Sequence, residues 1–274
     1  MKCKLREFEG KGGRNVFQNN YPLFNSGRLL KIEMLTELRD FPREFFDLRF
    51  NEYSNGIIFG CDIDVSDNYI KIQKGIIKYQ DVIYLLKEDN KLEYTCNNKL
   101  IVLKVKFLPE ILNSDFKINS TEISLSEDLD LGENEIELCR FKLKVGAKLR
   151  IMHVDFNDLS TEYDTVNTIY APYAAYGESS LNPKILRRFG RELLECNLSE
   201  AWDIAFAMNC VQSKESIQKE IIVSYLINKL GIEMKDYSNE DLYYYLLEVL
   251  RSAKEGVKNH GRRGSGRFKK ILID

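Results

Sequence analysis

The hydrophobic residues of this chain change their spacing along the sequence, and that change limits the folds that 274 residues can adopt. Between residues 53 and 107, apolar and polar residues alternate in short runs, which is typical of strands. From residue 182 onward, apolar residues recur every three or four positions, as they do on one face of a helix. The sequence therefore predicts a β-rich part followed by a helical part.

The expected strands are separated by turn residues, above all Asn, Asp and Gly. We expect strands at 63–65, 70–72, 76–79, 82–86 and 100–107, and a later pair at 136–145 and 149–154. Within 100–107 both alternating sets of residues are apolar, which predicts a strand that is buried on both faces. Residues 109–135 are acidic and are expected to form a loop.

A helix is expected before the strands, because aliphatic residues recur there at helical spacing. They are Leu29, Leu30, Ile32, Leu35 and Leu38. Pro42 should end or bend this helix. A cluster rich in aromatic residues follows, and it is expected to pack on the next element. It consists of Phe41, Phe45, Phe46, Leu48 and Phe50.

The helical part carries clear start signals. Asn182 stands before Pro183, which predicts an N-cap followed by the first helical residue of a helix that runs to about Cys196. Ser199 and Ser213 are expected to cap the next two helices, because a serine hydroxyl can accept a hydrogen bond from the free backbone N–H groups of a first turn.

The stop signals are equally local. Gly231 is expected to end the third helix of this part in the left-handed conformation that glycine adopts at low cost. Ser238 and Asp241 have the spacing of a capping box for a last helix. That helix should extend through Leu250 and stop near Gly256.

These elements predict an α+β protein. An N-terminal β-rich module, sandwich or barrel-like, is preceded by a helix and followed by a C-terminal helical module. The tyrosine-rich linker between the modules is too aromatic for a free tether and should lie along a surface. The expected division is a flexible N-terminal arm at 1–20, a helix plus β-rich domain at 21–156, a linker at 157–181, a helical domain at 182–256 and a basic C-terminal arm at 257–274.

No constellation of residues with catalytic or metal-binding spacing is present. The chain has two His and no phosphate-binding glycine loop of the P-loop type. Asp62 and Asp64 could bind a hard cation, but their alternation with apolar residues favours the solvated face of a strand. His153 is expected to be a half-buried packing residue. We therefore predict no catalytic, binding or metal site, no cofactor and no enzymatic activity.

The six cysteines are spread along the chain without a C-x-x-C pair, which favours reduced, buried thiols. Lys and Arg number 40 against 42 Asp and Glu, so the net charge of −2 gives no overall attraction to nucleic acid or acidic lipid. No apolar run reaches the ~18 residues that a membrane span needs. The first residues lack the apolar stretch of a secretory signal, and an intracellular protein is expected.

The C-terminal tail has the most specific local composition in the sequence, which is basic and rich in glycine. Basic residues alternate with glycine around Phe268, a composition that can grip single-stranded nucleic acid or fold onto an acidic partner protein. The apolar residues 271–273 slightly favour the protein partner. The basic residues are Lys258, Arg262, Arg263, Arg267, Lys269 and Lys270.

Two stretches resemble a known family. Residues 21–86 contain a helix at Ser26–Leu35, a strand pattern at Tyr53–Val65 and a hairpin pattern at Gly75–Leu86. Their order resembles the N-terminal region of small baseplate proteins of contractile phage tails and phage-tail-like bacteriocins of Firmicutes and, more distantly, the type VI secretion baseplate adaptor. Residues 182–231 resemble the helical half of the same proteins.

The resemblance implies a structural component of a contractile-tail baseplate that links tube, sheath or fibre proteins. It implies no cofactor and no reaction. The implied partners are other baseplate and tail proteins, and several copies of the chain itself, with no membrane and no nucleic acid. Such a protein is cytoplasmic during assembly and then part of a released particle. The alternative is a nucleic-acid-binding protein that uses the basic tail.

Overall fold

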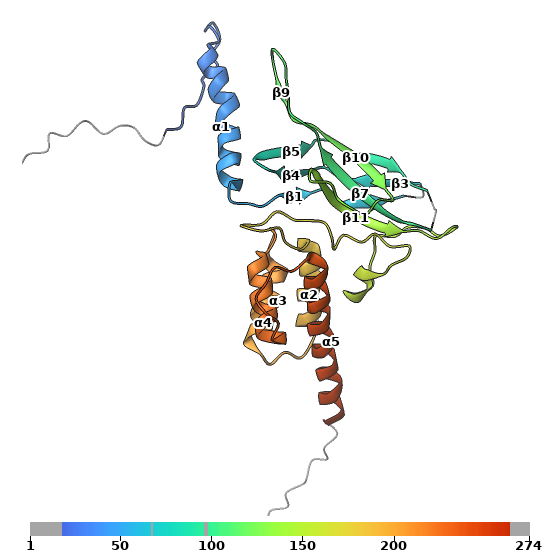
Figure 1. The fold of residues 1–274 in the computed structure, drawn as a ribbon. Coiled ribbons are helices and arrows are strands. Elements are labelled where there is room, and N and C mark those ends of the chain that lie inside the picture. The colour runs from blue at the N-terminus through green and yellow to red at the C-terminus, as the bar shows by residue number, and fades with distance from the viewer. Residues whose placement is uncertain (1–17, 67, 96–97, 264–274) are drawn as a thin grey trace, which may run out of the picture. The chain divides into compact units, whose positions relative to one another are not determined.

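A computed structural model describes residues 18–66, 68–95 and 98–263, with the backbone alone for 256–263. The chain divides into two compact units, residues 1–51 and 52–274. The sequence instead predicts boundaries at residues 20, 156, 181 and 256, and this domain division stays a prediction. The fold class is confirmed, because a helix comes first, small antiparallel sheets follow, and a helical region ends the chain (Figure 1).

The first unit contains the expected helix, α1, at Ile32–Phe50. The helix starts after Leu29 and Leu30 and continues through Pro42, which therefore does not end it. Its 19 residues include none that is buried. The ring of Phe46 lies 6.0 Å from that of Phe45 and 6.5 Å from that of Phe50. Packing of this cluster on the next element stays a prediction.

The β-rich part of the second unit consists of three three-stranded antiparallel sheets and one short hairpin. Their strand orders are β1-β4-β5, β2-β3-β6 and β10-β7-β11, and β8 pairs with β9. The strands are β1 (Gly56–Gly60), β2 (Ile63–Val65), β3 (Tyr69–Ile72), β4 (Gly75–Tyr79), β5 (Val82–Leu86), β6 (Asn90–Glu93), β7 (Leu100–Phe107), β8 (Ile111–Leu112), β9 (Lys117–Ile118), β10 (Thr121–Ser126) and β11 (Glu135–Lys142).

Strand β7 is the centre of its sheet and is buried on both faces, as its two apolar sets predict. The predicted loop at 109–135 is wrong in part, because it contains β10. The short alternation of Glu122 and Ser124 with Ile123 and Leu125 lets that stretch pair with β7 in regular register.

The predicted strand at 149–154 is also wrong. Only Arg150 forms an isolated bridge there, to Thr165. The backbone N–H of Val154 instead donates to the carboxylate of Asp158, which directs this stretch toward a short 3-10 turn, η1 (Asn157–Ser160). The preceding strand, β11, ends at Lys142 and not at the expected residue 145.

As far as residue 263, where the description of the backbone ends, the helical part contains four α-helices. They are α2 (Pro183–Leu194), α3 (Ala201–Gln212), α4 (Lys219–Leu230) and α5 (Asn239–Arg263). The cap of α2 is confirmed, because the Asn182 side chain accepts a hydrogen bond from the Lys184 N–H at 2.8 Å. The left-handed Gly231, with φ of 69°, and the capping box of Ser238 and Asp241 are confirmed as well.

Three helix boundaries differ from the prediction. Helix α3 begins after Glu200 with no side-chain cap, so Ser199 is not its cap. Ser213 closes α3, and α4 begins only after Gln218. The buried side chain of Ile217 explains the delay, because residue 217 enters the core from the irregular segment 213–218. Helix α5 continues through Gly256 to Arg263.

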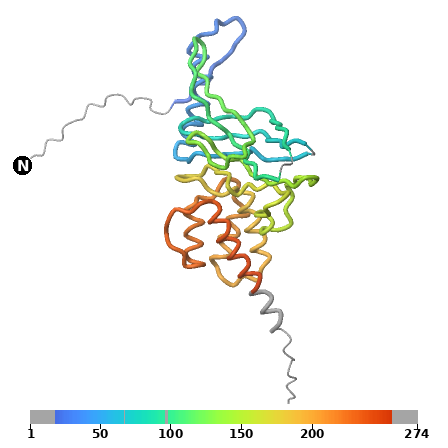
Figure 2. The backbone as a smooth tube through the Cα atoms, turned by 45° about the vertical axis from the view of Figure 1, so that its right-hand side comes forward, coloured from blue at the N-terminus to red at the C-terminus, as the bar shows by residue number. Residues whose placement is uncertain are grey.

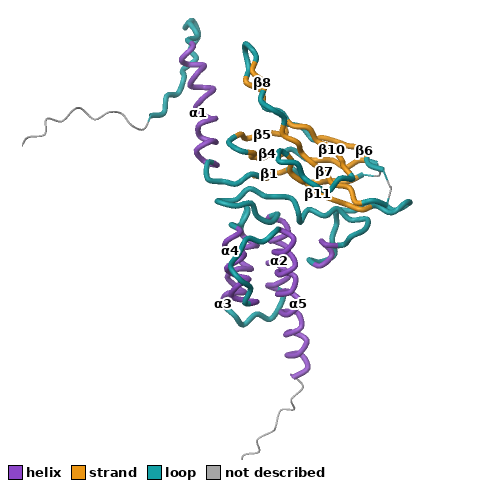
Figure 3. Tube along the Cα trace, viewed as in Figure 1, coloured by secondary structure: helices purple, strands orange, loops and turns teal. Residues whose placement is uncertain are grey.

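The segment 157–181 does not lie on the surface as predicted. It runs between the strands and the helices of the second unit (Figures 2 and 3) and contributes to both hydrophobic cores. Leu159, Ile169 and Leu181 pack into the helical core, and Val166 and Tyr173 pack into the core of the sheets. Part of the segment also pairs with β1, since the Ile57 N–H donates to the Pro172 carbonyl at 2.9 Å.

Candidate interaction site

The two carboxylates that the sequence analysis considered as cation ligands, Asp62 and Asp64, form ion pairs with lysines. The Asp62 carboxylate lies 2.6 Å from the ammonium of Lys184 on α2, and that of Asp64 lies 3.4 Å from Lys71 on the neighbouring strand β3. Within the described ranges, no group of three His, Cys, Asp or Glu side chains is placed to hold a metal ion.

The thiols and the histidine are packing residues where the structure describes them. Cys61, Cys139 and Cys210 are buried, and burial raises the pKa of Cys61 and of Cys210 to about 12. Cys196 is half-buried, and Cys3 and Cys96 lie outside the described residues. His153 is half-buried with Nε2 3.2 Å from the Val166 carbonyl oxygen, and its burial lowers its pKa below 6.5.

The basic tail lies outside the residues whose side chains are described, so nucleic-acid binding by it stays a hypothesis. The tyrosine run of α5, Tyr243 to Tyr245, is divided between the core and the surface. Tyr243 is fully buried and donates to the Phe156 carbonyl at 2.7 Å, whereas half of Tyr244 is exposed. No described helix is both long and apolar enough to cross a membrane.

Large apolar side chains are exposed at several places in the second unit, among them the β8–β9 hairpin and helix α3. The hairpin β8–β9 extends beyond the sheets (Figure 1) and exposes Ile111, Leu112 and Phe116, the last with 68% of its surface free. Helix α3 exposes Trp202 and Met208, although its other face lies in the helical core. Exposed apolar side chains that lie near one another are typical of surfaces that bind other proteins.

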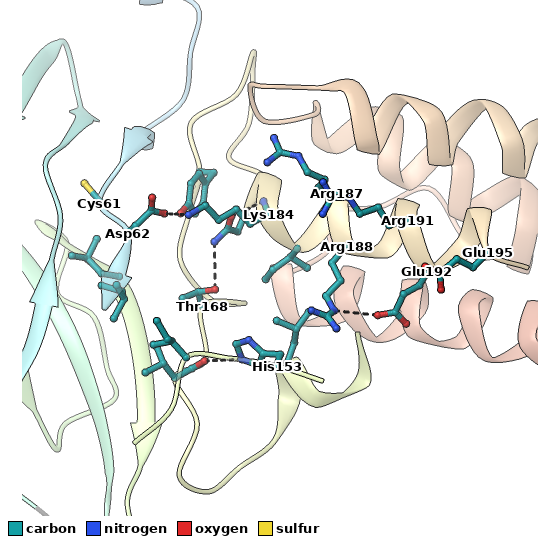
Figure 4. A pocket seen from close by; sticks show the side chains of 18 residues that line it. Cys61, Asp62, His153, Thr168, Lys184, Arg187, Arg188, Arg191, Glu192 and Glu195 are labelled. Carbon is teal, nitrogen blue, oxygen red and sulfur yellow. Dashed lines mark hydrogen bonds and ion pairs between the residues drawn. The ribbon is translucent and has the colours of Figure 1, made fainter. Parts of the chain in front are cut away.

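A cleft of about 590 Å³ separates the first turns of α2 from the strands (Figure 4). One wall comes from Cys61, Asp62 and Ile63 between β1 and β2. The other wall is the polar face of α2. Four basic side chains point from that face toward the cleft, namely Lys184, Arg187, Arg188 and Arg191.

The fold holds these basic residues in place because α2 is strongly two-sided. Its apolar residues Ile185, Phe189 and Leu193 are buried in the helical core, so the opposite face is turned to the cleft. Glu192 fixes the far end of α2. Its carboxylate accepts from the Phe156 N–H at 2.6 Å, from Arg188 at 3.1 Å and from Lys254 at 2.7 Å.

Sequence reasoning did not single out this basic face. The signal was present in the spacing of positions 184, 187, 188 and 191, which share one side of a helix. The facing residues Asp62 and His153 are 122 and 31 positions from residue 184, and only the tertiary fold brings them to the same cleft.

Among solved structures, this chain is similar to proteins of the type VI secretion baseplate. A crystal structure of TssK superposes with a TM-score of 0.41 and 8% identity, covering 88% of this chain and 72% of TssK. A chain of the TssK-TssF-TssG baseplate subcomplex gives 0.40 and 9%, covering 87% and 100%. A chain of the type VI baseplate complex gives 0.35 and 10%, covering 86% and 99%.

These neighbours are parts of multi-subunit baseplate assemblies, but the TM-scores and identities are too low to establish a shared fold. No family model matches the chain. No curated protein matches its sequence.

Proposed function

We propose that this chain is a structural component of a contractile-tail baseplate, of a phage or of a phage-tail-like bacteriocin, where it links neighbouring tail proteins. Its partners are other baseplate and tail proteins, together with further copies of the chain itself. It assembles in the cytoplasm and then becomes part of the released particle. No reaction, membrane or nucleic acid is part of this proposal.

The observation that carries the proposal is helix α1. Seven of its large apolar side chains are exposed and none of its residues is buried. Burial of an apolar face, and not intrinsic propensity, supplies most of the stability of helices in proteins. A partner that covers α1 would supply that burial. The exposed residues are Ile32, Leu35, Leu38, Phe41, Phe45, Phe46 and Leu48.

The contractile-tail context comes from the resemblance of residues 21–86 and 182–231 to small baseplate proteins of such tails. The first of these stretches includes α1 and strands β1 to β5. Helix α1, with its exposed apolar side chains, therefore lies in one of the two stretches that carry the resemblance.

Co-production with the proteins encoded beside its gene tests the proposal. We expect the tagged full chain to form a stable complex with at least one sheath, tube or baseplate protein. Leu38→Asp with Phe45→Asp should abolish the complex, because a charge would replace each of two apolar contacts on α1. Glu44→Lys on the same helix is the matched control and should keep it. A monomer that binds none of these proteins contradicts the proposal.

A further inference from the structure

The basic cleft beside α2 has unpaired positive charge. Among the residues that the structure describes, the Arg191 side chain makes no hydrogen bond or ion pair. Arg187 donates one hydrogen bond, to the Ser213 carbonyl at 3.1 Å, and has no carboxylate partner within the described chain. The two guanidinium groups stand one helical turn apart on the wall of the cleft (Figure 4).

The other charges of the cleft are mostly neutralised. Lys184 pairs with Asp62, and Arg188 pairs with Glu192. Glu195 at the outer end is the remaining carboxylate of the lining. His153 adds no charge at neutral pH, because burial holds its pKa below 6.5. The lining therefore carries four cations against three carboxylates, a small positive excess that is located at Arg187 and Arg191.

Part of the remaining lining is apolar, beside the polar side chains of Thr168 and Asn182. Leu138, Ile151, Leu159 and Val166 lie among the lining residues. The volume of about 590 Å³ is within the range of clefts that enclose small ligands or a few residues of peptide. A segment that presents carboxylates on methylene stems fits this combination, because its stems meet apolar atoms while its charged ends reach the arginines.

We propose that the cleft binds a carboxylate-rich segment of a second protein, with Arg187 and Arg191 as the residues that pair with its acidic side chains. Guanidinium groups bind carboxylates through two parallel hydrogen bonds, which favours arginine for this task. A polyphosphate fits less well, because it has no methylene stems to contact the apolar side chains of the lining, and the positive excess of the lining is small. The inference goes beyond the baseplate role and does not depend on it.

A fluorescein-labelled hexaglutamate peptide is the probe, and its binding to the full chain is measured by fluorescence anisotropy at low salt. We expect saturable binding that weakens as salt is added. The double variant Arg187→Ala/Arg191→Ala should raise Kd by about a hundredfold, since each lost charge-assisted pair corresponds to roughly tenfold in affinity.

The matched control removes two exposed lysines of the β-rich part, Lys87→Ala/Lys106→Ala, and therefore changes the net charge equally. Its Kd should stay within about twofold of the wild-type value. Circular dichroism must show that both double variants are folded. If hexaglutamate does not bind, or binds the arginine variant and the wild type alike, the assignment is wrong. Displacement of the peptide by pyrophosphate at equal or lower concentration would also overturn it, because the site would then be a phosphate site.

Discussion

Gly190 lies where α2 and α3 come closest. A Cβ atom at this position would be 2.6 Å from the Ala207 carbonyl oxygen and 2.8 Å from the Cβ of Cys210. Both neighbours are buried in the helical core and cannot move aside without disturbing it. The absence of a side chain at residue 190 therefore sets the separation of the two helices, and with it the position of the basic face of α2.

Gly190→Ala should destabilise the protein by about 1–3 kcal/mol, because the added methyl group overpacks the core. Alanine is the better helix former by roughly 1 kcal/mol, so helix propensity alone predicts the opposite sign. Urea unfolding followed by circular dichroism gives the free energy. Ser252→Ala on the exposed side of α5 is the control and should be neutral or slightly stabilising. An unchanged midpoint for Gly190→Ala would refute the close-approach explanation.

Asp203 joins α3 to α4 through a buried pair. Its carboxylate accepts from the Tyr225 hydroxyl at 2.9 Å and from the Lys229 ammonium at 2.7 Å. Asp203→Ala should cost about 3 kcal/mol of unfolding free energy, because it leaves the buried Tyr225 hydroxyl without its acceptor and the partly buried Lys229 ammonium with only the exposed Glu200. Glu200→Ala, which removes the exposed partner of the same lysine, should cost less than about 1 kcal/mol. Equal costs in chemical denaturation would contradict this account.

Two predicted helix caps differ in outcome, because the cap at Ser238 is present and the cap at Ser199 is not. Ser238→Ala should destabilise the protein by about 1 kcal/mol, because the Ser238 hydroxyl accepts from the Asp241 N–H at 3.1 Å. Ser199→Ala has the same chemistry but removes no cap, since α3 starts after Glu200. Thermal unfolding of the two variants checks this, and a larger effect for Ser199→Ala would mean that the sequence-based cap is the true one.

One carboxylate makes four hydrogen bonds within the stretch between β11 and α2. Asp158 accepts two hydrogen bonds from Arg150, at 2.6 and 2.7 Å, one from the Thr161 hydroxyl and one from the Val154 N–H. The Arg150 guanidinium, as the largest influence, holds the pKa of Asp158 far below its usual range. The native state therefore binds the proton of this group less readily than the unfolded chain does.

It follows that Asp158 stabilises the fold above the pKa of an unfolded aspartate, near ~3.9, and that this stabilisation is lost as the pH falls below that value. Asp158→Asn should lower the unfolding free energy at pH 7 and have a smaller effect at pH 3. Urea titrations at both pH values measure the difference. Asp115→Asn in the exposed β8–β9 loop should show no such dependence. A constant difference between the wild type and Asp158→Asn at the two pH values would contradict the linkage.

The elements that the sequence predicted correctly are those with local causes. The caps at Asn182 and Ser238 and the strand β7 depend on residues within a few positions of one another. The delayed start of α4 could not be predicted in this way, because burial of Ile217 in the core overrides the cap signal at Ser213. The cleft could be predicted only in part. The basic face of α2 follows from the local spacing of its residues, whereas the wall opposite it depends on the tertiary fold.

At the scale of the whole second unit, the segment 157–181 joins the sheets to the helices. Two ties strengthen this connection. The Arg140 guanidinium lies 3.4 Å from the ring centroid of Tyr170, and the Tyr170 hydroxyl donates to Glu240 on α5. Because both hydrophobic cores include side chains from this one segment, neither core is complete when the segment leaves its place.

We therefore expect residues 52–274 to unfold in one cooperative transition. Leu103→Ala in β7 removes a fully buried side chain of the sheets and should cost about 2–5 kcal/mol. Trp202, the single tryptophan, lies on the exposed side of α3, and its fluorescence reports on the unfolding of that helix. In this variant, the urea midpoint measured by Trp202 fluorescence should fall as much as the midpoint measured by far-ultraviolet circular dichroism. If the Trp202 midpoint does not move, the two cores unfold independently.

The alternation of core contacts along 157–181 restricts how genes for such chains can recombine. Side chains for the sheets and for the helices follow one another within a few residues, as with Val166, Ile169 and Tyr173. A crossover at any point of this segment would combine side chains from two different genes in one core, and those side chains would not have been selected to pack together. Sheets and helices should accordingly be inherited as a pair, while a crossover near residues 51 and 52 would divide neither compact unit and would allow α1 to be exchanged without a change in either core.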